Sequence, residues 1–242
     1  AGGAAAARKV LHLIRHGQAA HNVRAEVRRA QGCAHQEFMR LMREDDCFDA
    51  PLTDVGLQQA LAAGERVRTR AGISNIDLVA ASPLWRALQT ADLVLPHGAL
   101  PLAPARLCLE HLRERAGVLE SCQRRPASEL RALWPSWEFG MVPEDDEPLS
   151  DELETIAACS NRGYEALRLI WEHPARNAAL VAHGGFFKHL LEDHPQVAAH
   201  AAVRGRFGNC EVRSCALSSE PGDAGPSFRL DPLPEGAEES LH

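Results

Sequence analysis

An arginine, a histidine and a glycine follow one another at Arg15-His16-Gly17, at the end of a short apolar run. Residues 11–14 predict a buried strand, and a glycine permits a sharp turn where that strand ends. A neutral imidazole is a nucleophile, and a guanidinium is a rigid fork for phosphate oxygens. The pair therefore predicts covalent phosphoryl transfer through the histidine. The alternative interpretation is that both side chains only cap a surface turn.

Two other apolar runs also end in polar residues that suit a phosphate. The run at 76–80 is followed by Ser82 and, one helical turn later, by Arg86. The run at 178–182 ends at His183, and the glycine pair after it opens a predicted helix whose N–H groups favour an anion. Adjacent parallel strands end at the same edge of a sheet, so we expect all these groups to converge on one pocket. A single strand-end histidine is more often structural, but two of them with two arginines favour a catalytic site.

Strand-like apolar runs alternate with helix-like segments along most of the chain. The predicted elements are strand 9–15, a helix over 54–72, strand 76–80, a helix after Pro83, helix 151–171, strand 178–182, a helix from Phe186 and an edge strand at 211–217. This alternation predicts an α/β fold, a three-layer α/β/α sandwich. Its central sheet is expected to be mainly parallel, with helices on both faces.

Two segments have no clear period and are predicted to cover the site. Residues 18–50 are rich in Arg, His and Asp, and residues 96–150 mix Pro, Trp and charge. We expect both as insertions over the C-terminal edge of the strands, within a single domain over residues 9–217. Residues 1–8 are predicted to be a flexible N-terminal segment. Residues 218–242, rich in Pro, Gly and acids, are predicted to be a disordered acidic tail.

The composition excludes several classes of protein. A net charge of -7 argues against a nucleic-acid binder, and no apolar run is long enough to span a membrane. Seven cysteines without a CxxC pair indicate reduced thiols rather than a disulfide framework or a zinc site. We therefore expect no metal, no cofactor and a cytoplasmic monomer or homodimer. A plastid protein is the alternative if the Ala- and Gly-rich start is the remainder of a transit peptide.

Four ordered blocks resemble the motifs of the histidine phosphatase superfamily, also called the phosphoglycerate mutase-like family. They are Leu13–Gln18 with Asn22, Pro51–Ala60, Ala81–Ala91 and Val181–Phe186. Three shorter stretches resemble the plant and fungal phosphoglycerate mutase-like proteins within it: residues 48–50, 123–125 and 209–213. The resemblance covers about residues 9–217.

The resemblance implies that His16 attacks phosphorus and is transiently phosphorylated. The residues expected to bind the phosphate are Arg15, Asn22, Arg86, His183 and, through the helix start that follows, Gly184. A phosphoryl transition state spreads negative charge over its equatorial oxygens, so positioned cations supply most of the catalysis. His183 acts best when it is protonated, which a nearby phosphate favours. His16 must be neutral at its attacking nitrogen.

The leaving oxygen needs a proton, which a carboxyl group must supply. Residues 112–117 resemble the acid segment of the family, and this places the general acid at Glu114. Burial and the bound phosphate would raise its pKa, whereas Arg113 and Arg115 beside it would lower it, so the direction of these arginines matters. Glu110, one helical turn earlier, is the competing candidate.

The resemblance alone does not distinguish a phosphatase, which transfers the phosphoryl group to water, from a mutase, which transfers it to a second substrate. Glycolytic mutases carry a long insertion after the acid and paired arginines for the substrate carboxylate. Here Arg124 and Arg125 follow Glu114 by ten residues, and the mutase tyrosine-glycine-glycine pattern is missing. We therefore expect a phosphatase for phosphorylated small metabolites. A mutase-type phosphotransferase and a non-catalytic phospholigand-binding module are the alternatives. Arg124 and Arg125 are candidate substrate-binding residues, or else a solvated basic turn.

Overall fold

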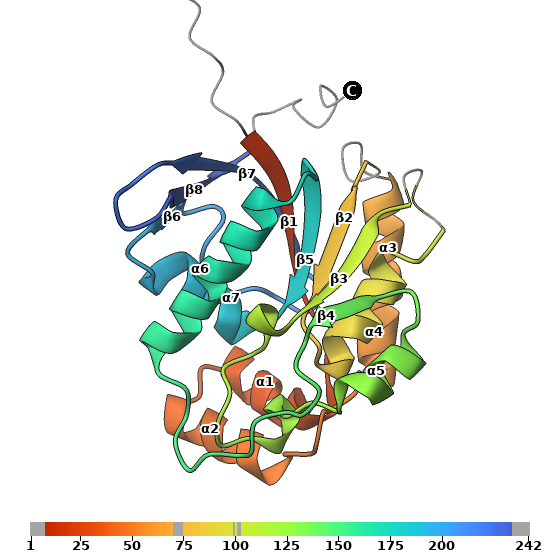
Figure 1. The fold of residues 1–242 in the computed structure, drawn as a ribbon. Coiled ribbons are helices and arrows are strands. Elements are labelled where there is room, and N and C mark those ends of the chain that lie inside the picture. Colours follow the sequence, from red (N-terminus) through yellow and green to blue (C-terminus); the bar gives the residue numbers. More distant parts are fainter. Residues whose placement is uncertain (1–7, 70–74, 99, 101–102, 234–242) are drawn as a thin grey trace, which may run out of the picture.

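Strands form the centre of the structure, a computed structural model that describes residues 8–69, 75–98, 100 and 103–233 (Figure 1). They are β1 (Arg8–Arg15), β2 (Leu78–Ala81), β3 (Ala105–Leu109), β4 (Glu138–Met141), β5 (Asn177–Ala182), β6 (Val197–Ala199), β7 (Val212–Glu220) and β8 (Ser227–Pro232). Within the described residues they make one eight-stranded sheet in the order β4-β3-β2-β5-β1-β7-β8-β6. Strand β7 is antiparallel to β1 and β8, and the other neighbouring pairs are parallel. The predicted mainly parallel sheet is confirmed.

Helices cover both faces of this sheet. The α-helices are α1 (Val23–Ala30), α2 (His35–Glu44), α3 (Asp54–Thr69), α4 (Trp85–Val94), α5 (Ala127–Leu133), α6 (Ile156–Glu172) and α7 (Gly184–Asp193). Three short 3-10 turns are η1 (Ala20–Asn22), η2 (Glu110–Leu112) and η3 (Glu120–Cys122). Figure 1 shows α6 and α7 on one side of the sheet and α3 and α4 on the other. The predicted three-layer sandwich is therefore confirmed.

Alternating strand side chains supply two separate hydrophobic cores. In β5, Ala178, Leu180 and Ala182 join the core under α6 and α7. Ala179 and Val181 join the core under α3 and α4. Because successive side chains of a strand point to opposite faces, a strand covered on both faces must be apolar throughout. The continuous apolar runs in the sequence reflect this double burial.

The strand register brings three chain turns to one edge of the sheet. Arg15 pairs with Ala182 across β1 and β5, and Ala81 pairs with Val181 across β2 and β5. The strands therefore end level with one another. The residues that follow them leave the sheet side by side: His16, Ser82 and His183.

Two glycines allow the start of α3 to lie against the turn after β1. A β-carbon at Gly56 would be 2.0 Å from the carbonyl oxygen of Gln18. A β-carbon at Gly17 would be 2.7 Å from the carbonyl oxygen of Gly56. No larger residue fits at either position without moving backbone, so this close approach fixes the turn that carries the strand-end histidine.

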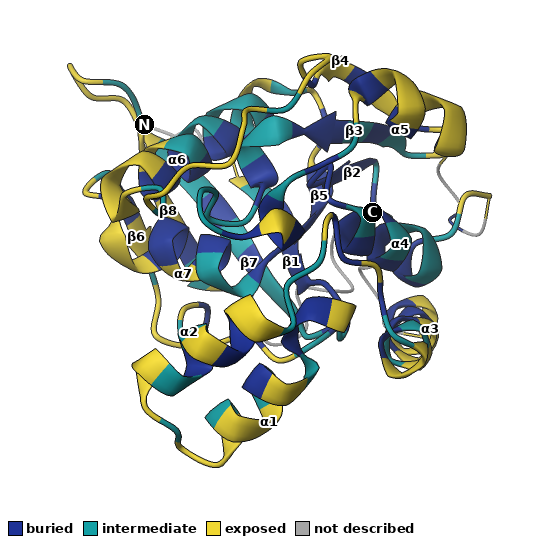
Figure 2. Cartoon of the chain, turned by 90° about the horizontal axis from the view of Figure 1, so that it is seen from below, coloured by how far each residue is buried: buried dark blue, intermediate teal, exposed yellow. Residues whose placement is uncertain are grey.

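Residues 20–46, which we call the cap, lie across the carboxyl edge of the sheet. Figure 2, seen from below, shows α1 and α2 of the cap with one buried and one exposed side. Their buried side chains form a cluster with residues 119 and 122 that is separate from the two main cores. Asp46 accepts hydrogen bonds from the backbone N of Glu120 (2.7 Å) and Ser121 (3.0 Å). The cover predicted at 18–50 is thus largely helical.

The C-terminal part of the chain corrects two predictions. The tail predicted to be disordered at 218–242 contains the end of β7 and all of β8, so this prediction is wrong for residues 218–233. Phe228 and Leu230 are 2% and 0% exposed and join the core under α6 and α7. Strand β7 lies between β1 and β8, so the edge strand predicted at 211–217 is an inner one. The Pro, Gly and acidic composition concealed a two-residue apolar alternation.

Some predicted segments have different limits. The helix predicted at 151–171 begins at Ile156, because Thr155 caps it by accepting a hydrogen bond from the backbone N of Ala158 (3.1 Å). Arg8 already belongs to β1. Residues 1–7 of the predicted flexible segment, 70–72 of the helix predicted after Thr53, and 234–242 of the predicted tail lie outside the described residues.

Candidate active site

His16 lies directly beyond β1 and is 3% exposed. Its Nδ1 is 2.7 Å from the carbonyl oxygen of Gly17, so Nδ1 carries the hydrogen and donates it. The unprotonated ring nitrogen is then Nε2. Burial and the guanidiniums of Arg86 and Arg15 hold the pKa of His16 well below its usual range. The ring is therefore neutral at pH 7, which is the state that a nitrogen nucleophile requires.

Arg15, the last residue of β1, is held along one edge of its guanidinium. Its two terminal nitrogens donate to the carbonyl oxygen of Phe207 (2.8 Å) and to Oε1 of Glu26 in α1 (2.8 Å). Burial disfavours ionisation of Glu26, but Arg15 and Arg206 outweigh it and lower its pKa. The cap thus supplies a carboxylate that orients Arg15 from the side.

Arg86 lies in the first turn of α4 and is completely buried. One terminal nitrogen donates to the carbonyl oxygen of Ser121 (2.6 Å). The hydroxyl of Thr90 donates to the carbonyl oxygen of Arg86 (2.7 Å) and accepts from the backbone N of Gly17 (3.1 Å). These bonds connect the start of α4 to the turn after β1, so Arg86 is held close to His16.

His183 faces His16 from the end of β5. The two ring centroids are 5.0 Å apart, and Nε2 of His183 is hydrogen-bonded to the hydroxyl of Ser82 (2.8 Å). Burial, Arg86 and His16 lower its pKa well below the usual value. His183 is therefore neutral in the free protein. Its protonation by a bound phosphate stays a prediction.

Asn22 and Gly184 lie beside these groups and support the backbone around them. The side-chain oxygen of Asn22 accepts a hydrogen bond from the backbone N of Ala19 (3.3 Å). A β-carbon at Gly184 would be 3.2 Å from Nε of Arg15, so glycine lets the arginine lie against the start of α7. Direct binding of a phosphate by either residue stays a prediction.

Four buried nitrogen atoms near His16 have no hydrogen-bond partner in the described part of the chain. They are Nε of Arg15, Nε of Arg86, Nδ1 of His21 and Nδ1 of His183. A buried polar atom without a partner is costly, and the repulsion between two guanidiniums adds to that cost. A tetrahedral oxyanion supplies both the missing acceptors and the missing negative charge. Binding of an oxyanion by these groups stays a prediction.

Glu114 approaches the site from the segment after η2. Its Oε2 accepts from the backbone N of Gly185 (3.0 Å), and its Oε1 accepts from the backbone N of Arg115 (3.0 Å). The carboxyl group therefore lies at the start of α7, the helix that begins directly after His183. Arg113 and Arg115 are turned away, toward Asp146 and the carbonyl oxygen of residue 154.

Glu110 is occupied by protein groups instead. Its Oε1 pairs with Arg113 (2.6 Å) and its Oε2 with Nε of Arg124 (2.9 Å). Both carboxylate oxygens therefore hold buried guanidiniums. Of the two candidates for the general acid, only Glu114 contacts the helix start beside His183.

The arginine pair at 124–125 lies in the second predicted cover, residues 96–150, which we call the covering segment. Both arginines hold parts of this segment together. The side chain of Arg124 is completely buried and also donates to the carbonyl oxygens of Pro143 (2.9 Å) and Asp145 (3.1 Å). It is neither a solvated turn nor free to bind a substrate, which corrects both interpretations. Arg125 is half-buried, pairs with Glu129 (2.6 Å) and lies over the ring of Trp85, 4.5 Å from its centroid. The structure thus brings neither arginine into contact with the buried nitrogens around His16.

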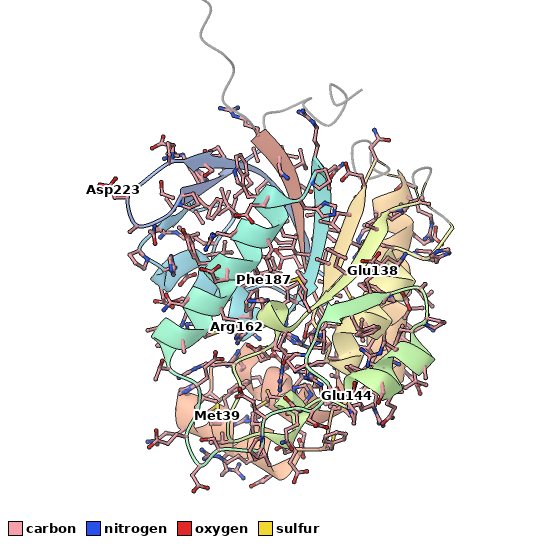
Figure 3. All side chains as sticks on the ribbon, in the orientation of Figure 1. Met39, Glu138, Glu144, Arg162, Phe187 and Asp223 are labelled. Atoms are coloured by element: carbon pink, nitrogen blue, oxygen red, sulfur yellow. The ribbon has the colours of Figure 1, made fainter. Side chains whose placement is uncertain are left out.

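Arg162 of α6 completes this covering network. Its guanidinium donates to the carbonyl oxygens of His111 and Arg113 (2.9 Å each) and pairs with Glu154 (2.7 Å). Figure 3 shows Arg162 on the side of α6 that faces the covering segment. Helix α6 therefore holds the segment around Glu114 through Arg162, in addition to the contact of Glu114 with the start of α7.

Sequence reasoning missed two buried residues and one half-buried residue of the site. His21 and Glu26 stand in a segment with no clear period, so nothing marked them as site residues. Asp49, which is 1% exposed, accepts a hydrogen bond from the backbone N of Trp85 (2.8 Å), next to Arg86. Asp49 belongs to the stretch 48–50 that resembles the plant and fungal proteins, but its residue type alone indicated no role in the site.

The comparisons with known proteins identify the family of this chain. The chain matches the histidine phosphatase superfamily (branch 1) over residues 11–221 and belongs to that family. Phosphoglycerate mutase-like protein 1 of Arabidopsis thaliana is 31% identical over 240 residues, covering 86% of this chain and 81% of that protein. Probable phosphoglycerate mutase GpmB of Yersinia pestis is 30% identical over 213 residues, with 87% and 86% covered.

A solved structure of similar fold is the mycobacterial glucosyl-3-phosphoglycerate phosphatase. It is 23% identical, with a TM-score of 0.53, and the match covers 94% of this chain and 99% of that one. This likeness confirms the fold. Membership of the family supports an enzyme of the phosphatase or mutase type.

Two further properties concern the described residues alone. None of their helices combines the length and the apolar character needed to cross a membrane. These residues also hold no group of three or more His, Cys, Asp or Glu side chains arranged to bind a metal ion.

Proposed function

We propose that this protein is a metal-independent phosphatase that hydrolyses phosphomonoesters of small metabolites through a phosphohistidine. The observation that carries the proposal is the ring of buried, unpartnered nitrogen atoms around the neutral His16. A nucleophile surrounded by fixed cationic donors suits a transferring phosphoryl group, because its charge is stabilised where it develops.

The reaction has two steps. Nε2 of His16 attacks phosphorus, the bond from phosphorus to the ester oxygen breaks, and Glu114 gives its proton to the leaving alcohol. A water molecule then attacks the phosphorus of the phosphohistidine, and the bond from phosphorus to Nε2 of His16 breaks. Glu114 takes up a proton from that water, and inorganic phosphate leaves. The fixed guanidiniums of Arg15 and Arg86 stabilise the charge in both steps.

Hydrolysis is favoured over a mutase reaction by the place of Arg124. A mutase must hold a phosphorylated acid through its carboxylate, and the arginine pair was the candidate for that contact. The guanidinium of Arg124 is already hydrogen-bonded to Glu110 and to backbone carbonyl oxygens. A mutase-type transfer is the second candidate, since the two relatives described above carry phosphoglycerate mutase in their names.

The test uses p-nitrophenyl phosphate at mildly acidic pH with a chelator present. We expect turnover, and an acid-labile phosphoenzyme after rapid quenching, in the parent protein. His16→Ala should lose about 10³-fold or more in kcat/KM and form no phosphoenzyme. His35→Ala, on the exposed face of the cap, is the matched control and should stay active.

Three outcomes would contradict the proposal. Full activity of His16→Ala would show that the reaction does not pass through a phosphohistidine at this residue. Binding of phosphorylated ligands without turnover would make the protein a binding module. Efficient interconversion of phosphoglycerates, measured in a separate assay, would establish the mutase.

A further inference from the structure

His21 is a third histidine of the anion site. It lies in η1, directly after the turn that follows β1, and is 3% exposed. After burial, the guanidiniums of Arg86 and Arg15 are the main causes that lower its pKa. His21 in turn lowers the pKa of both His16 and His183. His21 therefore lies around the nucleophile together with Arg15, Arg86 and His183.

A buried histidine that only supports packing has partners for its ring. His12 of β1 is such a residue: it is 1% exposed, its Nδ1 is bonded to Ser214 and its Nε2 to Asn177, both at 2.8 Å. Nδ1 of His21 is equally buried but has no hydrogen-bond partner among the described residues. Among the described residues, the cap thus brings a buried nitrogen close to Arg15 and Arg86 without a hydrogen-bond partner for it.

We propose that His21 is a further phosphoryl-binding residue, which donates a hydrogen bond from Nδ1 to an oxygen of the phosphoryl group. The inference rests on the proposed function, since it assumes that the site holds phosphate. Arg15 and Arg86 hold the phosphoryl group from the sheet and from α4, and His21 holds it from the cap. His21 of the cap then completes the set of donors.

The charge balance gives this role a signature in proton uptake. The groups that face His21 are two guanidiniums and the two other site histidines, so the free imidazole is neutral. A phosphate dianion placed among them reverses the local field and favours the imidazolium. When the anion binds, His21 should therefore take up a proton, as His183 is expected to do.

The experiment measures binding of orthovanadate and of inorganic phosphate by calorimetry in two buffers of different ionisation enthalpy. The variants are His21→Leu, which removes the donor, and His21→Asn, which keeps an amide donor close to the place of Nδ1. His35→Leu on the exposed face of α2 is the matched control. Thermal unfolding of each variant, with and without orthovanadate, checks the fold and measures ligand stabilisation independently.

We expect His21→Leu to weaken orthovanadate binding about tenfold or more and to reduce proton uptake, with binding largely restored in His21→Asn. A purely structural role would lower the unfolding temperature and leave proton uptake per bound anion unchanged, which would overturn the inference. Parent-like binding by a folded His21→Leu would overturn it as well. If the parent protein itself neither bound these anions nor turned over, the proposed function would fail instead.

Discussion

Two groups of buried arginines in this molecule differ in what compensates their charge. In the covering segment, Arg124 pairs with Glu110, and Arg113 pairs with Glu110 and Asp146. Around His16, the guanidinium of Arg86 donates a hydrogen bond to the carbonyl oxygen of residue 121 and to no carboxylate of the described residues. Arg15 has one carboxylate, on the edge away from its unpartnered Nε.

The difference shows how one residue type serves two purposes. A buried guanidinium that is paired holds segments together, and removal of either partner leaves an uncompensated charge. A buried guanidinium without a hydrogen-bonded carboxylate, such as that of Arg86, is unfavourable in the free protein and becomes favourable when an anion binds. Arg15 keeps one carboxylate, but its charge adds to that of Arg86 beside His16. The first group should therefore affect stability and the second should affect phosphate chemistry. Each prediction below tests that division.

The largest effect is expected for Arg15→Lys. Lysine keeps the charge but cannot reach Phe207 and Glu26 while also presenting a donor to the site. We expect kcat/KM for p-nitrophenyl phosphate to fall about 10³-fold with the thermal unfolding temperature little changed. Arg24→Lys, an exposed arginine of the same cap, is the control and should leave both values unchanged. Full activity of Arg15→Lys would mean that only charge matters at this position.

The matching experiment in the covering segment is Arg124→Ala. It leaves Glu110 with one guanidinium and frees the carbonyl oxygens of Pro143 and Asp145, so we expect a loss of about 3 kcal/mol in the free energy of unfolding. Turnover per folded molecule should change little. Urea unfolding and steady-state kinetics on the same preparation measure the two effects. A catalytic loss without a stability loss would place Arg124 in the substrate site after all.

The sequence predicted the parts of the site that end apolar strands. Arg15, His16 and His183 follow from runs of buried residues, because register alone then brings strand ends together. Glu114 came from resemblance, and its contact with the start of α7 depends on how the segment after η2 folds back. His21 lies at the start of the cap in the three-residue turn η1, which is too short to show a period that indicates burial.

Burial of charge was the other property that the sequence did not reveal. Arg124 stands in a charged stretch whose composition is typical of a solvated turn, yet its side chain is completely buried. The tail beyond residue 218 is similar, since acids, prolines and glycines surround the two apolar side chains that fill the core. In both cases a few long-range contacts outweigh the local composition.

A third prediction separates the two acid candidates by the leaving group. A β-carbon at Gly185 would lie 2.5 Å from Oε1 of Glu114, so Gly185→Ala must displace the carboxyl group. We expect about a 10²-fold loss of kcat for an alkyl phosphate and a much smaller loss for p-nitrophenyl phosphate, whose leaving group needs no proton. Glu114→Gln should behave in the same way. Glu110→Gln should lose stability without any dependence on the leaving group, and the reverse pattern would move the acid to Glu110.

The smallest effect concerns Asp49, a carboxyl between the two groups of arginines. It is 1% exposed, its Oδ2 is 3.6 Å from Nε of Arg125, and burial raises its pKa to about 6. The folded protein then binds this proton more tightly than the unfolded chain, so Asp49 lowers the stability as the pH rises from about 4 to about 6.

Asp49→Asn removes this dependence, and asparagine tolerates the positive φ of 42° at this position. Relative to the parent, the variant should therefore gain about 2 kcal/mol in unfolding free energy between about pH 4 and about pH 7. Urea unfolding across that range measures the gain, with the exposed Asp151→Asn as the control. A constant difference at all pH values would mean that the carboxylate is already compensated by Arg125 and Arg86, and would assign Asp49 to the paired group.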